Sequence, residues 1–443
     1  MSSPSSLHRV LGSIERTGMR LTDHVFEVPL DHANPDGEQL EVFAREITGP
    51  TENETDRDRD PDQEPWLVFF QGGPGMAANR PLELGGWLEE ALKSFRVLLL
   101  DQRGTGRSAP LNRQTLPRRG GTREQANYLR HFRADSIVAD AELIRRRLGV
   151  EKWSILGQSF GGFCALTYLS TAPESLREAL ITGGLGPVTG PIEDVYRATY
   201  IRVKARNEEF YGWYPRDRDM ARRVAEHLQA VPEDLPSGER LTVHRFQMLG
   251  NLLGGNSRVH NLHFLLEDPF VTTVDGERVS DGFLEQVGAV VSYAANPLYA
   301  VMHESIYSQG PATNWAADRV LAERPDFSVA ADPLLFTGEM IHPWYFEEDP
   351  ALIPLAEVAD EVSKIADWGQ LYDLDQLARN NVPAAAAVYL DDIFVAHELS
   401  LQTASSVAGL RIWETGDYHH DGLRQDGAVV FARLLSMCRQ DNE

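Results

Sequence analysis

A serine between glycines, directly after a short apolar run, constrains this chain more than any other feature. The segment covers residues 153–162, WSILGQSFGG, and the residues after it have the apolar spacing of a helix. Strand, sharp turn and helix form the context of a Gly-x-Ser-x-Gly nucleophile elbow, where close backbone contacts leave no room for a Cβ beside the serine. The motif predicts Ser159 as an exposed nucleophile. The alternative is a glycine-rich loop that contains a serine by chance.

Length and charge limit the classes of protein to which the chain can belong. Its 443 residues suffice for several average domains, or for one α/β body with an inserted lid. It has 42 basic and 66 acidic residues, a net charge of −24, which argues against nucleic acid as a partner and weakly favours a cationic substrate. Solubility alone explains most of these charges.

Neither secretion nor membrane insertion is indicated. The two cysteines, Cys164 and Cys438, are too few for a disulfide framework. The first residues lack an apolar core of signal-peptide length, and no run approaches a membrane span. We therefore expect a cytoplasmic protein without a membrane partner, and the oligomeric state stays open.

Apolar and alternating runs predict one sheet. Residues 25–45 predict a β-hairpin at the edge of that sheet, and the polar segment 51–64 predicts a solvated loop. A helix predicted over residues 135–148 leads into the strand before Ser159, an order that implies parallel strands. Further buried strands are predicted at residues 66–70, 97–100, 179–182, 382–390 and 410–413.

Between the predicted strands at 179–182 and 382–390 the sequence pattern changes. From about residue 191 to 368 helical spacing dominates and aromatic residues are dense, which indicates an inserted helical cap. The expected organisation is a first part of an α/β core at 1–190, a cap at 191–368 and a second part of the core at 369–443.

Two loops follow predicted strands. QGGPG at 71–75 exposes backbone N–H groups, which an oxyanion hole requires, and predicts donors at Gly73 and at Phe160, the residue after the serine. An ordinary turn is the alternative. DQRGTGRS at 101–108 predicts a structural ion-pair role for Asp101 and Arg103, and it lacks the pattern of a phosphate-binding loop.

An acid and a histidine follow the serine in the order expected for a catalytic triad. Asp391 and Asp392 end one predicted strand, and His419 and His420 lie after the next. A serine hydroxyl needs a base, imidazole titrates near neutral pH, and a buried carboxylate holds its tautomer. The order Ser…Asp…His is that of the α/β-hydrolase fold. Ser159 is thus the expected nucleophile.

The base and the acid each have alternatives. Consecutive side chains point apart, so only one of His419 and His420 can face the serine, and His420 is favoured; His397 is expected at the surface. Either Asp392 or Asp391 orients the base, and activity should fall below about pH 6 as the base protonates. No metal-binding spacing occurs, so neither a metal nor another cofactor is expected.

The chain resembles the prolyl aminopeptidases (proline iminopeptidases) of the α/β-hydrolase fold, in their longer-chain branch. The likeness covers nearly the whole chain outside the acidic loop. It implies a mostly parallel central sheet with an inserted helical cap, and a serine aminopeptidase that releases N-terminal proline from peptides through an acyl-enzyme intermediate. The motifs in order are QGGPG, DQRGTGRS, GQSFGG, HESIY at 303–307, FTGEMIHPW at 336–344, VYLDDIFV at 388–395 and HHDGLR at 419–424.

The resemblance also bears on individual residues. It favours Asp392 over Asp391 and supports His420. Many members have histidine where Gln71 stands and glutamate where His419 stands, so the hydrogen bonding of the first loop and the charge around the base differ here.

Specificity is expected to reside in the cap. Glu304 and Glu339 match cap glutamates that the family uses to bind the substrate's protonated amine, for which charge-assisted hydrogen bonds are suited; a solvated helix face is the alternative. An esterase or amidase of the same fold and a catalytically inactive binding protein are the competing functions. The aromatic residues expected to form the wall of a pyrrolidine pocket are Phe160, Tyr307 and Trp344.

Overall fold

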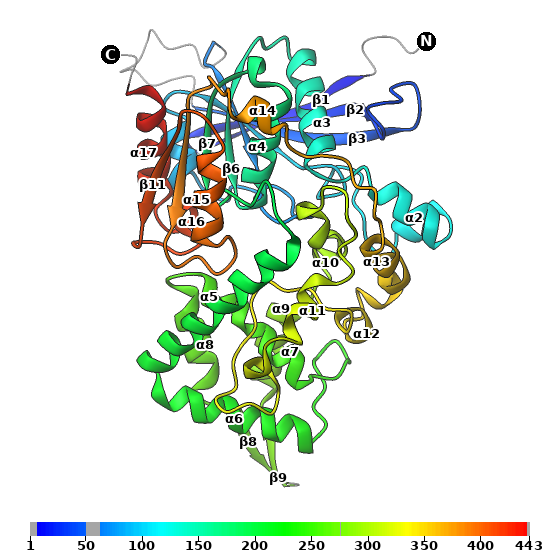
Figure 1. Ribbon diagram of the computed structural model, residues 1–443, viewed down its shortest axis with the longest axis vertical. Coiled ribbons are helices and arrows are strands. Elements are labelled where there is room, and N and C mark those ends of the chain that lie inside the picture. Colours follow the sequence, from blue (N-terminus) through cyan, green and yellow to red (C-terminus); the bar gives the residue numbers. More distant parts are fainter. Residues whose placement is uncertain (1–6, 50–62, 275, 441–443) are drawn as a thin grey trace.

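One mixed sheet organises the structure. The computed structural model describes residues 7–49, 63–274 and 276–440. The sheet forms one end of the molecule and a large helical region extends away from it (Figure 1). In spatial order the strands are β1 (His8–Arg16), β2 (Met19–Pro29), β3 (Gln39–Thr48), β5 (Arg96–Leu100), β4 (Trp66–Phe70), β6 (Trp153–Gln158), β7 (Leu176–Thr182), β10 (Ala384–Tyr389) and β11 (Leu410–Thr415).

The pairing of these strands explains their sequences. From β5 through β11 every pairing is parallel, whereas β1, β2 and β3 are joined by antiparallel pairings. Strands β4 and β10 are almost wholly apolar because helices cover both faces of the parallel part. The mostly parallel sheet predicted from the sequence is confirmed.

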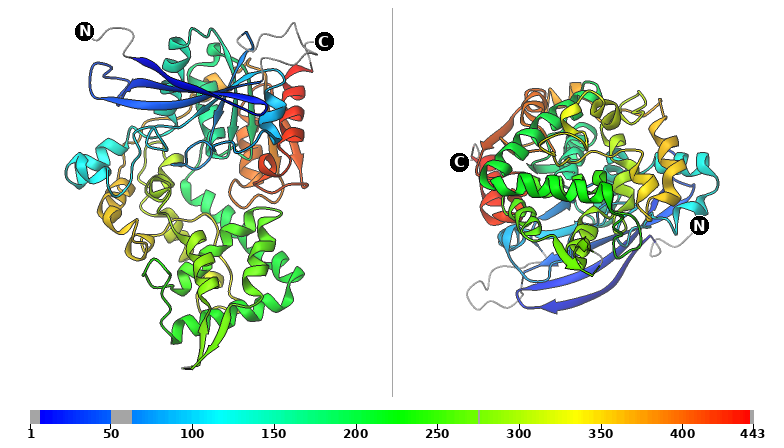
Figure 2. Two further views of the ribbon diagram at one scale, coloured as in Figure 1. Left: turned by 180° about the vertical axis from the view of Figure 1, so that it is seen from behind. Right: turned by 90° about the horizontal axis from the view of Figure 1, so that it is seen from below.

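Two groups of helices cover the sheet. On one face α3 and α4 form the larger core, and on the other α1 and α17 pack together (Figures 1 and 2). The helices of this part of the molecule are α1 (Gly86–Ala91), α2 (Thr122–Leu129), α3 (Ala134–Arg147), α4 (Phe160–Thr171), α14 (Leu374–Leu377), α15 (His397–Ser405), α16 (Gly422–Gln425) and α17 (Gly427–Arg439), with 3₁₀ turns η2 (Leu116–Arg119) and η3 (Pro173–Ser175).

The predicted hairpin exists as β2 and β3, but its predicted place at the sheet edge is wrong. Strand β1 pairs with β2 and forms the outer edge instead. Eight of its nine residues are exposed, so its sequence shows no alternation between buried and exposed positions. The solvated loop predicted at 51–64 lies almost wholly outside the described residues.

The helical region lies between β7 and β10 in the sequence and below the sheet in Figure 1. It also contains a small antiparallel hairpin, β8 (Phe270–Thr273) and β9 (Gly276–Val279), which the sequence did not indicate. Its helices are α5 (Ile192–Trp213), α6 (Pro215–Ala230), α7 (Val243–Gln247), η4 (Met248–Gly254), α8 (Arg258–Leu266), α9 (Asp281–Val291), α10 (Pro297–Met302), η5 (Glu304–Tyr307), α11 (Ala316–Leu321), η6 (Pro325–Phe327), α12 (Tyr345–Glu348), η7 (Ile353–Leu355) and α13 (Ala356–Ser363).

A buried arginine connects the helical region to the sheet. Arg133, just before α3, donates hydrogen bonds to the carbonyls of Ser305 (3.3 Å), Ser308 and Gly369 (2.9 Å). Its guanidinium also lies 4.5 Å from the ring of Trp368. The segment that carries Glu304 is thereby held against the core. In the ranges that the structure describes, no helix combines the length and the apolar character that crossing a membrane requires.

Candidate active site

Ser159 lies at the sharp turn between β6 and α4. Its backbone has φ 54° and ψ −124°, a conformation that non-glycine residues rarely adopt and that concentrates at functional sites. Two hydrogen bonds hold the turn: the N–H of Ser159 donates to the Thr182 carbonyl (3.0 Å), and its carbonyl accepts from the Gly162 N–H (2.7 Å). The elbow geometry predicted from the motif is present.

The flanking glycines are required by close backbone contacts. A Cβ on Gly157 would lie 2.3 Å from the carbonyl oxygen of Gly161, and a Cβ on Gly161 would lie 2.0 Å from the carbonyl oxygen of Phe70. Both distances are far shorter than a van der Waals contact, and the atoms approached belong to the rigid backbone. The helix after the serine therefore packs directly on the strands beside it.

Asp392 and His420 form a buried pair. His420 Nδ1 donates to Asp392 Oδ2 at 2.8 Å, and the other carboxylate oxygen accepts from the backbone N–H groups of Phe394 (2.8 Å) and Val395 (3.1 Å). The ring of Phe394 also packs edge-on against His420, with centroids 4.9 Å apart. The aspartate is thus fixed by its own loop, and it fixes the orientation of the imidazole.

Two glycines after β7 bring this pair close to the serine turn. A Cβ on Gly183 would lie 3.2 Å from His420 Nδ1 and 3.4 Å from Asp392 Oδ2. A Cβ on the next residue, Gly184, would lie 2.6 Å from the Ser159 carbonyl oxygen. Gly183 thus lies next to the acid–base pair, and Gly184 lies next to the serine turn. The serine, the aspartate and the histidine are therefore gathered at the carboxyl ends of neighbouring strands.

The electrostatic surroundings favour the protonated form of His420. Burial by itself lowers the pKa of this imidazole, but the charge and hydrogen bond of Asp392 and the charge of Glu339 outweigh burial and raise the pKa above its ordinary value of 6.5. The acid limb of activity is therefore expected at a higher pH than the sequence alone suggested. The effect of Glu339 also shows that its carboxylate lies within electrostatic range of the base.

The alternative acid and bases have other partners. The side chain of Asp391 is 66% exposed and lies 3.9 Å from Arg202. His419 donates from Nδ1 to the backbone carbonyl of Asp391 at 3.0 Å. His397 is partly exposed, and its Nε2 pairs with the exposed Glu414 at 2.7 Å. Within the described part of the chain, the only pair of side chains from these two aspartates and three histidines that contact each other is Asp392 with His420.

The loop 71–75 packs directly on the serine. A Cβ on Gly72 would lie 2.9 Å from the Cβ of Ser159 and 2.7 Å from the side chain of Gln158. Gly73 is the next residue in this loop. Phe160 is the first residue of α4, so its N–H has no intrahelical acceptor and is available at the serine turn. Both positions suit the donors of an oxyanion hole.

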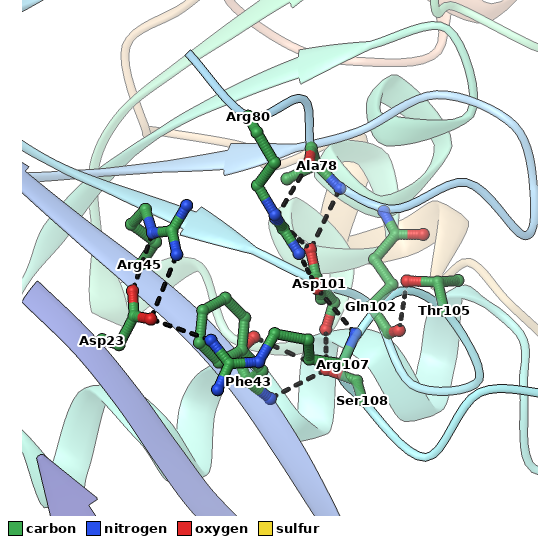
Figure 3. Close-up of polar contacts among 10 residues, drawn as sticks. All are labelled: Asp23, Phe43, Arg45, Ala78, Arg80, Asp101, Gln102, Thr105, Arg107 and Ser108. Atoms are coloured by element: carbon green, nitrogen blue, oxygen red, sulfur yellow. Dashed lines mark hydrogen bonds and ion pairs between the residues drawn. The ribbon is translucent and has the colours of Figure 1, made fainter. Parts of the chain in front are cut away.

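Asp101 braces the loop that follows these glycines (Figure 3). Its buried carboxylate accepts from the N–H of Ala78 (3.2 Å), the N–H of Arg107 (2.9 Å) and the guanidinium of Arg80 (Nη1, 2.8 Å). Gln102 donates from Nε2 to the Gln71 carbonyl at 2.9 Å. The segment 101–108 thus supports the loop that carries Gly73.

Asp101 and Arg103 both take part in ion pairs, but with different partners. Arg103 is buried and pairs with Asp140 on α3, with its Nε 2.7 Å from the carboxylate. It also donates to the carbonyls of Leu30 and His131. These contacts connect the loop to α3 and to the turn after β2, away from the serine.

Glu339 is surrounded by aromatic residues and remains partly accessible. Its side chain is 18% exposed, the Tyr299 hydroxyl donates to one oxygen, and His303 Nε2 lies 3.7 Å from the other. Burial and then the charge of Glu339 raise the pKa of Tyr299 well above its usual range, so this hydroxyl stays a donor. A carboxylate with one bound donor and remaining free lone pairs is suited to bind a cation.

Glu304 has a different environment. It is buried in η5, and its Oε1 accepts from the backbone N–H of Ala317 (2.9 Å) in the first turn of α11. Burial raises the pKa of Glu304, and the hydrogen bonds from Ala317, Thr313 and Ala316 act in the opposite direction. Glu304 is therefore buried and not part of a solvated helix face, and its carboxylate caps the first turn of α11.

The three aromatic residues expected around a pyrrolidine pocket do not lie together. Phe160 and Tyr307 both pack against Phe163, at centroid distances of 6.0 and 5.5 Å. Trp344 instead stacks on His342 and lines a cavity of about 240 Å³ inside the helical region. No residue of the Ser159, Asp392 and His420 set lines that cavity.

Several residues of the site had no sequence signal. Tyr299 contacts Glu339, and Arg80 holds Asp101, yet neither residue belongs to a motif. His303, which lies 3.7 Å from Glu339, is the first residue of HESIY, but the motif did not indicate this contact. The sequence HESIY includes no indication that Glu304 caps α11, since Ala317 lies outside the motif. Across the described residues, no group of three or more histidine, cysteine, aspartate or glutamate side chains could hold a metal ion.

Several known proteins are similar to this chain. Residues 65–212 match a family profile described as the alpha/beta hydrolase fold. The chain is 47% identical to a proline iminopeptidase of Aeromonas sobria over 442 residues, covering 99% of this chain and 100% of the relative. It is 35% identical to the proline iminopeptidase aneH of Aspergillus aculeatus, covering 94% and 93%. A solved structure of a proline iminopeptidase from Mycobacterium smegmatis is similar with a TM-score of 0.43 at 15% identity, covering 94% and 99%.

The fold and the serine elbow define an α/β hydrolase, as the sequence predicted. Full-length identity to curated relatives goes further. The chain belongs to the proline iminopeptidase family.

Proposed function

We propose that this chain is a serine aminopeptidase that releases N-terminal proline from peptides. The names of its full-length relatives support this reaction. The observation that carries the proposal is the buried His420–Asp392 pair beside the strained turn at Ser159. A serine hydroxyl becomes a nucleophile only with such a base, and the base keeps the required tautomer only with such an acid.

In the proposed mechanism the Oγ of Ser159 attacks the carbonyl carbon of the N-terminal proline. His420 takes the hydroxyl proton and then gives it to the leaving nitrogen, while Asp392 stabilises the imidazolium. The N–H groups of Gly73 and Phe160 stabilise the oxyanion. Water, activated by His420, then hydrolyses the prolyl ester and releases proline. No cofactor is required for these steps.

The proposed recognition of the substrate's amine rests on two acids. Glu339 is partly exposed and close enough to His420 to raise its pKa, so it is positioned to accept hydrogen bonds from a protonated amine. Glu304 adds negative charge from a buried position where its carboxylate also caps α11. If these two acids bind the amine, they fix its position relative to Ser159. Only the bond after the first residue of a peptide would then reach the serine.

We further propose the organisation and the location of the protein. The element order fits a core at 1–190 and 369–443 with a cap at 191–368, since α5 begins at Ile192 and the next sheet strand begins at Ala384. Cys164 and Cys438 are both free and buried, which fits a cytoplasmic protein. Peptides with N-terminal proline are its proposed partners.

A matched substrate pair tests the function. Prolyl p-nitroanilide and its N-acetylated form differ only in the charged amine. The proposal predicts rapid hydrolysis of the first and very slow hydrolysis of the second. Equal rates would instead support an esterase or amidase of the same fold, and no hydrolysis of either would support a binding protein.

A further inference from the structure

The loop that carries His420 is covered by one segment of the helical region, residues 254–258. Asn256 donates from Nδ2 to the Asp417 carbonyl at 2.8 Å, and its N–H donates to Asp421 Oδ1 at 3.4 Å. A Cβ on Gly254 would lie 2.1 Å from the ring of Phe394, the same ring that packs on His420. This segment therefore lies next to the catalytic base.

Arg258 is the last residue of this segment and the first residue of α8. Few of its N–H donors form hydrogen bonds with the described residues. A guanidinium has five N–H donors. Its polar contacts with the described residues are long: Nη2 lies 3.5 Å from the Gly254 carbonyl, and Nε lies 4.0 Å from Asp421 Oδ2. Among residues 7–49, 63–274 and 276–440, its buried Nε has no hydrogen-bond partner, while the side chain as a whole is 32% exposed. The guanidinium is thus accessible to a ligand, and the described residues do not accept all of its hydrogen bonds.

The charge of Arg258 acts on the site itself. Burial lowers the pKa of Arg258, and the acids that oppose this effect are Asp421, Glu339 and Asp392. In turn the charge of Arg258 lowers the pKa of His420. Two of the three acids belong to the proposed site, so the guanidinium lies within electrostatic range of the acid–base pair and of the proposed amine-binding carboxylate.

The position beside His420 determines which part of a substrate Arg258 can meet. His420 gives its proton to the leaving nitrogen, so the leaving group must lie on the histidine side of the scissile bond. In a dipeptide only one carbon separates that nitrogen from the C-terminal carboxylate. Carboxylates are bound well by guanidinium groups, which can donate two parallel hydrogen bonds.

We propose that Arg258 binds the C-terminal carboxylate of dipeptide substrates and so favours them over longer or amidated peptides. This inference rests on the proposed aminopeptidase function. It gives the site two opposite charges for the two ends of a dipeptide: Glu339 for the amine and Arg258 for the carboxylate. Arg258 is then a residue that determines substrate length.

The test compares prolyl-glycine with prolyl-glycinamide, which differ only in the terminal carboxylate. Wild-type enzyme should show a ratio of kcat/KM values that favours the free acid by about tenfold, the size expected for one charge-assisted contact at a partly exposed site. Arg258→Gln should bring this ratio close to one, and Arg258→Lys should retain part of it. Arg424→Gln removes an exposed positive charge on α16, within electrostatic range of Arg258, and should keep the wild-type ratio.

A purely structural role for Arg258 would lower both rates together and leave the ratio unchanged, and that result would overturn the proposal. A wild-type ratio near one would overturn it as well. Failure of the proposed function has a different signature: N-acetylprolyl-glycinamide would then be hydrolysed as fast as prolyl-glycinamide, whatever the effect of Arg258.

Discussion

Replacing Asp392 with asparagine should remove most of the activity without removing the fold. In the wild-type structure Oδ1 accepts from the N–H groups of Phe394 and Val395, so the amide oxygen of asparagine must take that place. The amide nitrogen then faces His420 Nδ1 and forces it to accept a hydrogen bond. The proton moves to Nε2, which can no longer take the proton of Ser159.

The size of the effect follows from this wrong tautomer. Losing a hydrogen bond to a charged group costs about 1.5–3 kcal/mol, and a base in the wrong tautomer costs more, as Asp→Asn in the serine protease triad shows. We expect kcat to fall by a factor of about 10³–10⁴, equivalent to roughly 4–5.5 kcal/mol of transition-state stabilisation. Asp391→Asn should stay within about twofold, because that side chain is exposed and its nearest cation, Arg202, is 3.9 Å away.

The pH dependence supplies a second readout for the same variant. In the wild type the pKa of His420 is raised above 6.5, so kcat/KM should decline as the pH falls through this raised value. Without the carboxylate, burial dominates and the pKa of His420 falls, so the residual activity of Asp392→Asn should persist to lower pH.

Steady-state hydrolysis of prolyl p-nitroanilide between about pH 5 and 9 measures both effects, because this range spans the titration of a histidine. Circular dichroism of each variant checks the fold. A larger loss in Asp391→Asn than in Asp392→Asn would refute the assignment of the acid. An acid limb that stays in place in Asp392→Asn would refute the electrostatic reasoning.

Other substitutions should separate chemistry, recognition and support. Ser159→Ala should lower kcat by at least about 10³ with an unchanged melting temperature; more than a tenth of wild-type turnover would place the nucleophile elsewhere. Glu339→Gln should lower kcat/KM for prolyl p-nitroanilide about ten- to a hundredfold but spare a small ester that lacks an amine. Glu304→Gln should act in the same direction and also lower thermal stability, by about 1 kcal/mol for the weakened cap of α11; an unchanged melting curve would contradict that role. Asp101→Asn leaves Arg80 without its charge partner and should destabilise the protein by about 1–3 kcal/mol in denaturant titration.

The sequence was sufficient for the fold class and for the sharp backbone turn at Ser159. The glycines around Ser159 mark the elbow because their Cβ atoms would overlap backbone, a constraint that shows in the sequence itself. The apolar runs of β4 and β10 reflect burial on both faces, and their order along the chain implies parallel pairing. Such local patterns carry physical information that needs no tertiary contact to interpret.

Features that depend on tertiary contacts could not be derived in the same way. The choice between Asp391 and Asp392 depends on which carboxylate turns toward Phe394 and Val395, and adjacent aspartates look alike in a sequence. The contacts of Glu304 with Ala317 and of Tyr299 with Glu339 join residues 13 and 40 positions apart, which no local pattern connects. Strand β1 was missed because an exposed edge strand has no alternating pattern of burial.

We propose that Ser159 attacks substrates held by their free amine. Labelling with a fluorophosphonate, followed by peptide mapping, tests both parts in one measurement. We expect the label on Ser159, and we expect prolinamide to slow labelling far more than N-acetylprolinamide at the same concentration. A label on another residue, or equal protection by the two amides, would contradict it.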